Sequence, residues 1–158
     1  MKRSPLFLLP VVAFALGCSA SAPTPSSRPA EFLTSPGAAE HSLPFSEAVR
    51  AGDLLILSGQ IGNVPGKLEL VPGGIGPEAR QALDNIRAIL QRHGASMDDV
   101  VKCTVFLADI REWPTFNDVY RGYFPRHFPA RSALAASGLV LGARVELECA
   151  AYQPAPRP

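Results

Sequence analysis

Apolar residues recur at helical spacing in two stretches of the chain. The first covers residues 77–93, begins with Pro77, which suits a first helical turn, and is followed by Gly94, which suits a helix end. The second covers residues 112–124 and is closed by Pro125. One side of each stretch is apolar and the other is polar. Both are therefore predicted to be amphipathic helices that pack on a core.

Short apolar runs bounded by turn-forming residues predict β-strands elsewhere in the chain. They cover residues 45–51, 54–61, 100–108, 131–136 and 143–152. Strands combined with only two helices predict an α+β domain built on a single sheet. Two helices can cover only one face of such a sheet.

The last predicted strand has one apolar face and one charged face. Val145, Leu147 and Cys149 alternate with Glu146 and Glu148, and alternate residues of a strand point to opposite sides of the sheet. The helices are expected to cover the apolar side. The face that carries the glutamates then needs another cover, and burial in an oligomer is the expected one.

Two charged residues in predicted strands are the first candidates for a functional site. Arg131 begins one short apolar segment, and Glu146 lies inside another. The guanidinium offers planar donors that suit a carboxylate, and the glutamate offers a base or an acceptor that orients water. Together they suggest a site for a small molecule with a carboxylate. A structural ion pair across two strands is the alternative, and it is the commoner origin of such charges.

Ser58, Gly59 and Asn117 are weaker candidates. Ser58 and Gly59 stand at an apolar strand end. The glycine allows a backbone or a ligand to approach closely, whereas a serine at a strand end more commonly bonds to the backbone. Asn117 lies beside the apolar face of the second predicted helix, where a surface polar residue is commoner than a ligand.

Length, charge and composition narrow the function classes. A chain of 158 residues suggests one domain, and a formal net charge of +1 gives no electrostatic footprint for nucleic acid. The histidines are scattered and no CxxC pattern occurs, which argues against a metal site. Cys103 and Cys149 lie among aliphatic residues of predicted strands. A disulfide is open to them in an oxidising compartment, but two buried free thiols are the preferred interpretation.

The N-terminal segment has the features of an export signal. A basic start precedes the apolar run 6–16, which is too short for a comfortable membrane span. Small residues then lead to Cys18, as in bacterial lipoprotein signals, where the cysteine is lipidated and becomes the new N-terminus. Ala15 stands where this pattern prefers leucine, so cleavage near Ala20 without lipidation is the alternative. Residues 1–18 are interpreted as a signal peptide, which implies export to the periplasm and, with a lipid on Cys18, an outer-membrane anchor.

Composition divides the rest of the chain into a tether, a domain and a tail. Residues 19–37 are rich in Ser, Pro and Ala and are interpreted as a disordered tether. The predicted elements place the domain at residues 38–154. Residues 155–158 form a short tail.

Six segments of the predicted domain match motifs of a known family. They are LSGQIG (57–62), ARQALDNIRAIL (79–90), DDVVKCTVFLADI (98–110), FNDVYRGYF (116–124), FPARSAL (128–134) and ARVELECAAY (143–152). With these motifs in the right order and few gaps between them, the chain resembles the RidA (YjgF) family of reactive-intermediate deaminases over roughly residues 38–154.

The resemblance implies a fold, an assembly and an activity. The fold is chorismate-mutase-like, and the assembly is a homotrimer whose sheets form a central barrel, with three sites in the clefts between subunits. The activity is the hydrolysis of enamines and imines, such as 2-aminoacrylate, 2-iminopropanoate and 2-iminobutanoate, to 2-keto acids and ammonia. No cofactor or metal is implied.

Site residues of the family can be carried over position by position. Arg131 matches the arginine that grips the substrate carboxylate, and Glu146 matches the glutamate that positions or activates the attacking water. Ser58 matches a pocket serine, with Gly59 beside it, and Asn117 matches an asparagine near the pocket. The resemblance thus implies catalytic roles for Arg131 and Glu146 and substrate contacts for the others.

Two further contact positions depart from the family pattern. Phe45 stands where the family often has a tyrosine, so a hydroxyl is missing. Ala133 stands where the family often has a cysteine, two residues after the arginine. Substrate contacts or rate are therefore expected to differ, but imine hydrolysis requires no covalent nucleophile.

Imine and enamine hydrolysis is the function that the sequence predicts. The alternative is a non-catalytic module that binds small carboxylates, such as keto acids, in the same cleft. An endoribonuclease, a role that some family members have been assigned, is disfavoured by the near-neutral charge and by the expected export.

Overall fold

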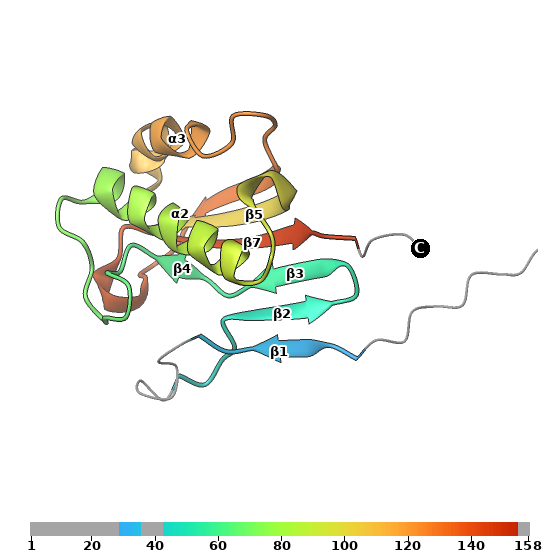
Figure 1. The fold of residues 1–158 in the computed structure, drawn as a ribbon. Helices are drawn as coiled ribbons and strands as arrows, with labels where there is room; N and C mark the ends of the chain where they lie inside the picture. The colour runs from blue at the N-terminus through green and yellow to red at the C-terminus, as the bar shows by residue number, and fades with distance from the viewer. Residues whose placement is uncertain (1–28, 36–42, 155–158) are drawn as a thin grey trace, which may run out of the picture.

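The structure, a computed structural model, describes residues 29–35 and 43–154. These residues form one mixed sheet with the strand order β1-β2-β3-β7-β5-β6, and β4 also pairs with β7 (Figure 1). β5 and β6 are parallel, and the other pairs are antiparallel. The strands are β1 (Glu31–Leu33), β2 (Ala48–Ala51), β3 (Leu54–Leu57), β4 (Gln60–Ile61), β5 (Val100–Leu107), β6 (Ala130–Ala135) and β7 (Val145–Tyr152).

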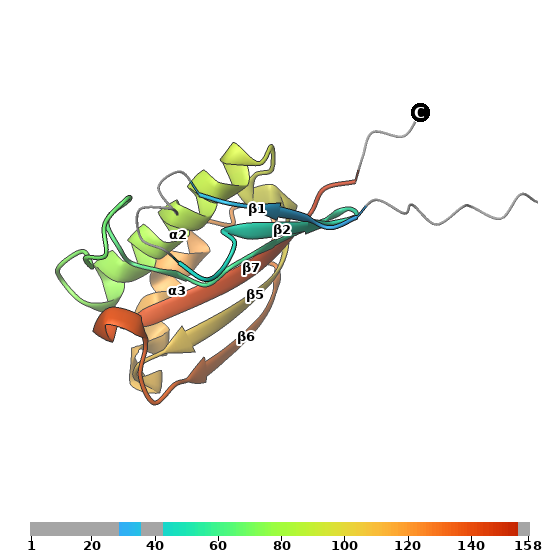
Figure 2. The same ribbon diagram turned by 90° about the horizontal axis from the view of Figure 1, so that it is seen from below.

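Both main helices lie on the same side of the sheet, as Figure 2 shows. They are α2 (Ile75–Arg92) and α3 (Trp113–Arg121). α2 begins two residues before Pro77, since Gly73 and Gly74 adopt positive φ and turn the chain into the helix. The predicted α+β class, with one sheet and two helices on one face, is confirmed.

Short 3₁₀ helices complete the connections between these elements. They comprise Met97–Asp99, Ile110–Glu112 and Val140–Gly142. The second of them leads directly into α3, which ends at Arg121, three residues before the predicted end. The predicted second helix is therefore a 3₁₀ turn followed by a shorter α-helix.

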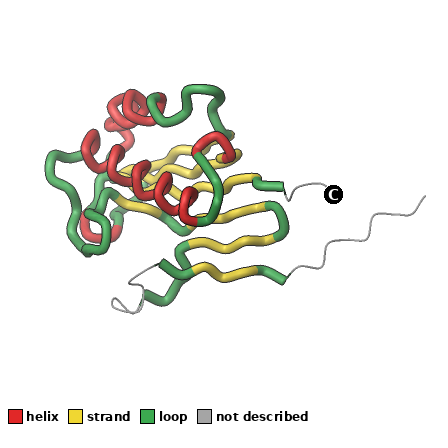
Figure 3. Tube along the Cα trace, in the orientation of Figure 1, coloured by secondary structure: helices red, strands yellow, loops and turns green. Residues whose placement is uncertain are grey.

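The hydrophobic core lies between the helices and the sheet, which Figure 3 shows packed against each other. The predicted alternation in β7 is confirmed, because Val145 and Leu147 are buried while Glu148 is exposed. Burying an aliphatic side chain of this size contributes roughly 1.5–3 kcal/mol. The largest fully buried side chains include Leu55, Leu83, Ile86, Leu90, Leu107 and Phe116.

The second predicted strand is in fact two strands, β3 and β4. Ile56 pairs with Ala150, and Gln60 pairs with Leu147. The first residues of these pairs are four positions apart in the chain, whereas their partners on β7 are three positions apart. The extra residue interrupts the ladder at positions 58–59, as in a β-bulge. Such an interruption can aim side chains and backbone groups in a new direction.

β1 lies inside the segment that was predicted to be a disordered tether. Leu33 pairs with Ala48 of β2, and the amide of Glu47 donates a hydrogen bond of 2.8 Å to the carbonyl of Leu33. The tether prediction is therefore wrong for these residues, and the folded domain begins before residue 38. A strand of three residues gives too short a pattern to be recognised among Ser, Pro and Ala.

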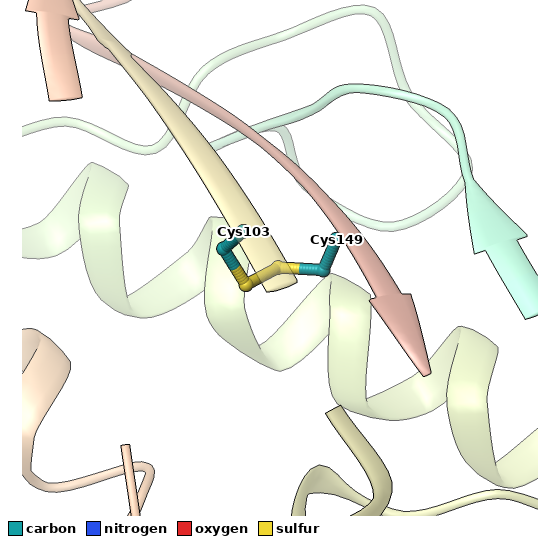
Figure 4. Close-up of a disulfide and its surroundings, with 2 residues drawn as sticks. All are labelled: Cys103 and Cys149. Atoms are coloured by element: carbon teal, nitrogen blue, oxygen red, sulfur yellow. A yellow bond between two sulfur atoms is a disulfide. The ribbon is translucent and has the colours of Figure 1, made fainter. Parts of the chain in front are cut away.

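Cys103 and Cys149 form a disulfide, so the preferred interpretation as free thiols is wrong (Figure 4). The two residues are direct register partners on β5 and β7, with their Cα atoms 4.1 Å apart. Both side chains are buried on the side of the sheet that faces the helices. The pairing of β5 with β7 places the two side chains next to each other, which allows the bond to form.

The predicted signal peptide 1–18, its lipidation at Cys18 and the tail 155–158 lie outside the described residues. Within the part of the chain that the structure describes, no helix has both the length and the apolar character needed to cross a membrane.

Candidate functional site

Arg131 lies on the helix-facing side of β6. Its register partner is Cys103 of β5, which is buried in the core, so both side chains point toward the helices. The guanidinium carbon lies 4.6 Å from the ring centroid of Tyr120, 5.6 Å from that of Phe116 and 5.8 Å from that of Trp113. These cation–π contacts place the guanidinium over the rings. Its N–H donors make no hydrogen bond to another described residue, so they can bind a ligand.

The surroundings of Arg131 leave its guanidinium available to a ligand. No carboxylate among the described residues forms an ion pair with it. Burial raises the pKa of Tyr120 to about 12, although the charge of Arg131 acts in the opposite direction. The phenol therefore stays neutral under the guanidinium at physiological pH. An arginine without an internal partner is suited to an anionic ligand.

Arg131 lines a cavity of about 520 Å³. Arg111 also lines it, but the Nε of Arg111 donates to both carboxylate oxygens of Asp109, at 3.0 and 2.9 Å. These hydrogen bonds lower the pKa of Asp109 to about 2, so the pair is a neutral unit. Arg131 is then the one lining residue in the described chain that offers an uncompensated charge. The remaining lining residues are Ile110, Trp113, Pro114 and Ala133.

Two of the predicted contact residues lie on the Arg131 side of the sheet. Ala133, two residues along β6, lines the same cavity. Asn117 lies on α3 beside Phe116 and is only 8% exposed, so its interpretation as a surface polar residue is wrong. Its role as a substrate contact stays a prediction.

Glu146 lies on the opposite face of the sheet. Its neighbours Val145 and Leu147 point into the core, so Glu146 points to the face without helices. Partial burial raises its pKa, and repulsion from Glu148 on the same face raises it further. A carboxylate whose pKa is raised toward neutrality is a better general base than an ordinary surface glutamate.

Gly59 lies directly against the carboxylate of Glu146. A Cβ atom added to Gly59 would overlap Oε1 of Glu146. The glycine therefore makes room for the carboxylate of Glu146, and the close approach of a backbone or a ligand stays a prediction. β4 brings the two residues together, because its Ile61 pairs with Glu146.

The remaining predicted residues are Ser58, between β3 and β4, and Phe45, in the segment before β2. The hydroxyl of Ser58 donates a hydrogen bond of 2.6 Å to the carbonyl of Ser46, which is the commoner interpretation of this serine. Phe45 is 54% exposed. The buried Glu47 accepts hydrogen bonds of 3.1 and 3.2 Å from Arg92 at the end of α2. This ion pair, which sequence reasoning missed, fixes the segment that carries Phe45.

Arg131 and Glu146 do not meet within one chain, because they lie on opposite faces of the sheet. The alternative of a structural ion pair between them is therefore wrong for the single chain. Each chain thus carries two candidate half-sites, the Arg131 cavity on one face of the sheet and Glu146 on the other. No group of three or more His, Cys, Asp or Glu side chains among the described residues is placed to hold a metal ion.

This fold, with a guanidinium-lined cavity on one face and a glutamate on the other, defines a known class of protein. The profile of the family described as Endoribonuclease L-PSP matches residues 36–153. The chain belongs to this family, which confirms the RidA resemblance. A relative from Bos taurus, named 2-iminobutanoate/2-iminopropanoate deaminase, is 48% identical over 110 residues, which cover 70% of this chain and 80% of the relative. A relative from Homo sapiens with the same name is 44% identical, with the same coverage.

Solved structures confirm the chorismate-mutase-like fold. RidA from the Antarctic bacterium Psychrobacter sp. PAMC 21119 has a TM-score of 0.67 and 35% identity, covering 70% of this chain and 89% of that one. Yeast Mmf1 has a TM-score of 0.68 and 34% identity, covering 77% of this chain and 93% of that one.

Proposed function

We propose that this protein hydrolyses reactive 2-imino and enamine acids, of the 2-aminoacrylate, 2-iminopropanoate or 2-iminobutanoate type, to 2-keto acids and ammonia. The observation that carries the proposal is the guanidinium of Arg131, stacked on aromatic rings at a cavity and without an internal partner. Relatives named as deaminases of such imines support the same reaction.

The reaction follows from what the two half-sites offer. Arg131 holds the substrate carboxylate and so orients the iminium carbon, which is already electrophilic. Glu146 takes a proton from water as the oxygen adds to that carbon, and it returns the proton to the nitrogen of the carbinolamine. The C–N bond then breaks with its electron pair on nitrogen. The hydroxyl passes its proton to the departing ammonia as the keto group forms, so the products are the 2-keto acid and ammonium. An enamine is first protonated on carbon by solvent, which gives the iminium ion.

We propose that the protein is a homotrimer in which Glu146 of one chain meets Arg131 of the next. The opposite orientation of these residues supports a site shared between chains, because one chain cannot form it. The face that carries Glu146 also exposes large apolar side chains, which an assembly would bury. They are Leu54, Ile56, Leu134 and Tyr152.

A mixing experiment tests the shared site. Arg131→Ala and Glu146→Gln chains are each expected to be inactive. Unfolded together and refolded at equal amounts, they place an intact Arg131 against an intact Glu146 at about one quarter of the interfaces if assembly is random. Activity should return to about that fraction of the wild-type value. Mixtures that remain inactive, although mass measurements show mixed trimers, would contradict the proposal.

The assay of the reaction itself generates each imine from its amino acid with an amino-acid oxidase and follows imine loss. Wild-type protein should accelerate hydrolysis of 2-iminopropanoate and 2-iminobutanoate. No acceleration for several imino acids, together with saturable binding of a 2-keto acid, would favour the non-catalytic binding module instead. Cleavage of RNA without imine hydrolysis would favour an endoribonuclease.

Gly59→Ala is expected to lower kcat roughly 10- to 100-fold while the protein stays folded. The new methyl group would displace the Glu146 carboxylate, which is the free end of a flexible side chain, and would leave the backbone in place. Steady-state kinetics and thermal melting measure the two effects. Gly138→Ala, at a glycine with open space around it, is the matched control. An unchanged kcat in Gly59→Ala would show that the position of this carboxylate does not matter.

The raised pKa of Glu146 predicts a pH-rate profile whose acid limb lies above the range of an ordinary carboxyl. Glu148→Gln removes the repulsion that contributes to the shift, so the limb should move to lower pH. The pKa of Glu146 is higher in the folded protein than in the unfolded chain. Ionisation of Glu146 therefore lowers the free energy of unfolding as the pH rises between these two pKa values. Glu146→Gln should therefore lose activity without losing stability at neutral pH. An acid limb that lies at the same pH in Glu148→Gln and in the wild type would contradict this assignment.

We also propose that the protein is exported, with cleavage before Cys18 and lipidation of that residue. The apolar N-terminal run after a basic start supports export. The disulfide supports it independently, because such bonds persist in oxidising compartments. Fractionation of cells and the mass of the mature N-terminal peptide test the proposal. A mature chain that keeps residues 1–18 in the cytoplasm would overturn it.

A further inference from the structure

We infer that Glu78, in the first turn of α2, is a positioning residue that fixes Glu146 for the proposed reaction. This inference rests on the proposed hydrolysis and adds to it a residue that does not touch the substrate. It starts from the burial of this carboxylate, because Glu78 is only 5% exposed. A buried carboxylate needs a hydrogen-bond partner, since burying its charge without one is costly in free energy.

The partner of Glu78 is the backbone at the start of β7. Oε2 of Glu78 accepts a hydrogen bond of 2.7 Å from the backbone N–H of Arg144. Arg144 directly precedes β7 and stands two residues before Glu146. A hydrogen bond with an ionised acceptor is roughly twice as strong as one between neutral groups. The carboxylate of Glu78 therefore restrains the point at which the chain enters the strand that carries the candidate base.

Glu78 also contacts the second strand beside Glu146. Ile61 of β4 is the register partner of Glu146, and Gly62 follows Ile61 directly. A Cβ atom added to Gly62 would lie 2.6 Å from Cα of Glu78 and 2.7 Å from its carbonyl oxygen. The backbones of the two residues are thus in close contact. The first turn of α2 is held against both strands of the pair in which Glu146 lies.

The simpler alternative is that Glu78 only stabilises α2. A carboxylate in the first turn of a helix interacts favourably with the positive end of the helix dipole. That interaction depends on the negative charge and does not require a bond to β7. The two explanations therefore differ in the property that matters, which is the charge for the helix and the reach of the acceptor oxygen for Glu146.

Two substitutions of Glu78 preserve one of these properties each. Glu78→Gln keeps the length and an acceptor oxygen but loses the charge, whereas Glu78→Asp keeps the charge but is one methylene shorter. With imine loss as the assay, kcat should fall about 10- to 100-fold in Glu78→Asp, since a displacement of about 1 Å can have that effect. In Glu78→Gln it should fall no more than about 3-fold. Equal kcat values in the two variants, or the lower value in Glu78→Gln, would overturn the inference.

Two further measurements separate positioning from a general loss of structure. In Glu78→Asp, KM and the Kd for the product 2-oxobutanoate should stay near the wild-type values, because Arg131 binds the carboxylate. Deuterium exchange at the backbone amide of Arg144 should be faster in this variant than in the wild type, since its acceptor is withdrawn. A fall in kcat with a matching rise in KM would indicate general distortion and overturn the inference. Faster exchange with an unchanged kcat would also overturn it.

Arg50→Leu is the structural control. It removes hydrogen bonds of 2.9 Å to the side chain of Gln153 and to the carbonyl of His93, beyond the opposite end of β7 from Glu146. It should lower the melting temperature and leave kcat unchanged. A wild-type protein that is active but whose Glu78 variants fall in the wrong order would refute this inference alone. A wild-type protein that accelerates no imine would refute the proposed function and this inference with it.

Discussion

Arg131→Ala is expected to lower kcat/KM for imino-acid hydrolysis on the order of 10³-fold, the largest effect on activity that the structure predicts. The guanidinium is the uncompensated cation of its cavity, because Arg111 is bound by Asp109. Without Arg131, the substrate loses both its affinity and its orientation toward the water. Steady-state rates of imine loss for the purified variant and wild type measure the effect.

Matched arginine variants separate this role from simpler explanations. Arg131→Lys keeps the charge but not the planar pair of donors, and should recover only part of the lost rate. Arg126→Ala removes an exposed arginine that pairs with Asp98, and should leave the rate unchanged. Loss of the cation–π contacts at Arg131 is worth about 0.5–2 kcal/mol, so Arg131→Ala should stay folded. A folded Arg131→Ala with undiminished turnover would refute the role.

The main elements could be predicted from the sequence because their patterns are long. The apolar stripe of α2 (Ile75–Arg92) spans several turns, and the alternation in β7 (Val145–Tyr152) spans eight residues. Each pattern also shows which face is buried. β1 (Glu31–Leu33) could not be found in this way, since its pairing with β2 is decided by contacts distant in sequence.

The charged residues of the candidate site could be predicted from the sequence, but their positions relative to one another could not. Arg131 and Glu146 were conspicuous as ionisable residues in apolar strands. The helix predicted at residues 112–124 was expected to use its apolar side for packing, but Phe116 and Tyr120 on that side also contact Arg131. Helical spacing identifies a face without identifying its partner. The partner depends on the register of β6, which no local pattern specifies.

The same limit applies to the disulfide. Cys103 and Cys149 each fit the pattern of a small apolar residue in a buried strand. Only the pairing of β5 with β7 places them directly opposite each other, 46 positions apart in the chain. Two residues that were expected to be free thiols therefore form a covalent link between the neighbouring strands β5 and β7.

Removing that link is expected to have the largest effect on stability. The double variant Cys103→Ala/Cys149→Ala frees a loop closed over 46 positions, for which the loop-entropy estimate is a loss of about 4 kcal/mol in the free energy of unfolding. For a domain of this size, the melting temperature should fall by about 10–20 °C. Thermal melts of wild type and variant at one protein concentration measure the difference, because an oligomer also melts according to its concentration.

Reductant provides the internal control for this prediction. It should lower the melting temperature of the wild type toward that of the double variant, once heating has exposed the buried bond, and should not change the variant. Activity at a temperature where both are folded should remain, since the disulfide lies in the core and not at the cavity that Arg131 lines. A wild-type melting temperature that is the same with and without reductant, with the bond shown to be reduced, would mean that packing of β5 against β7 suffices. The stability of the domain would then not depend on the oxidising compartment that the disulfide favours.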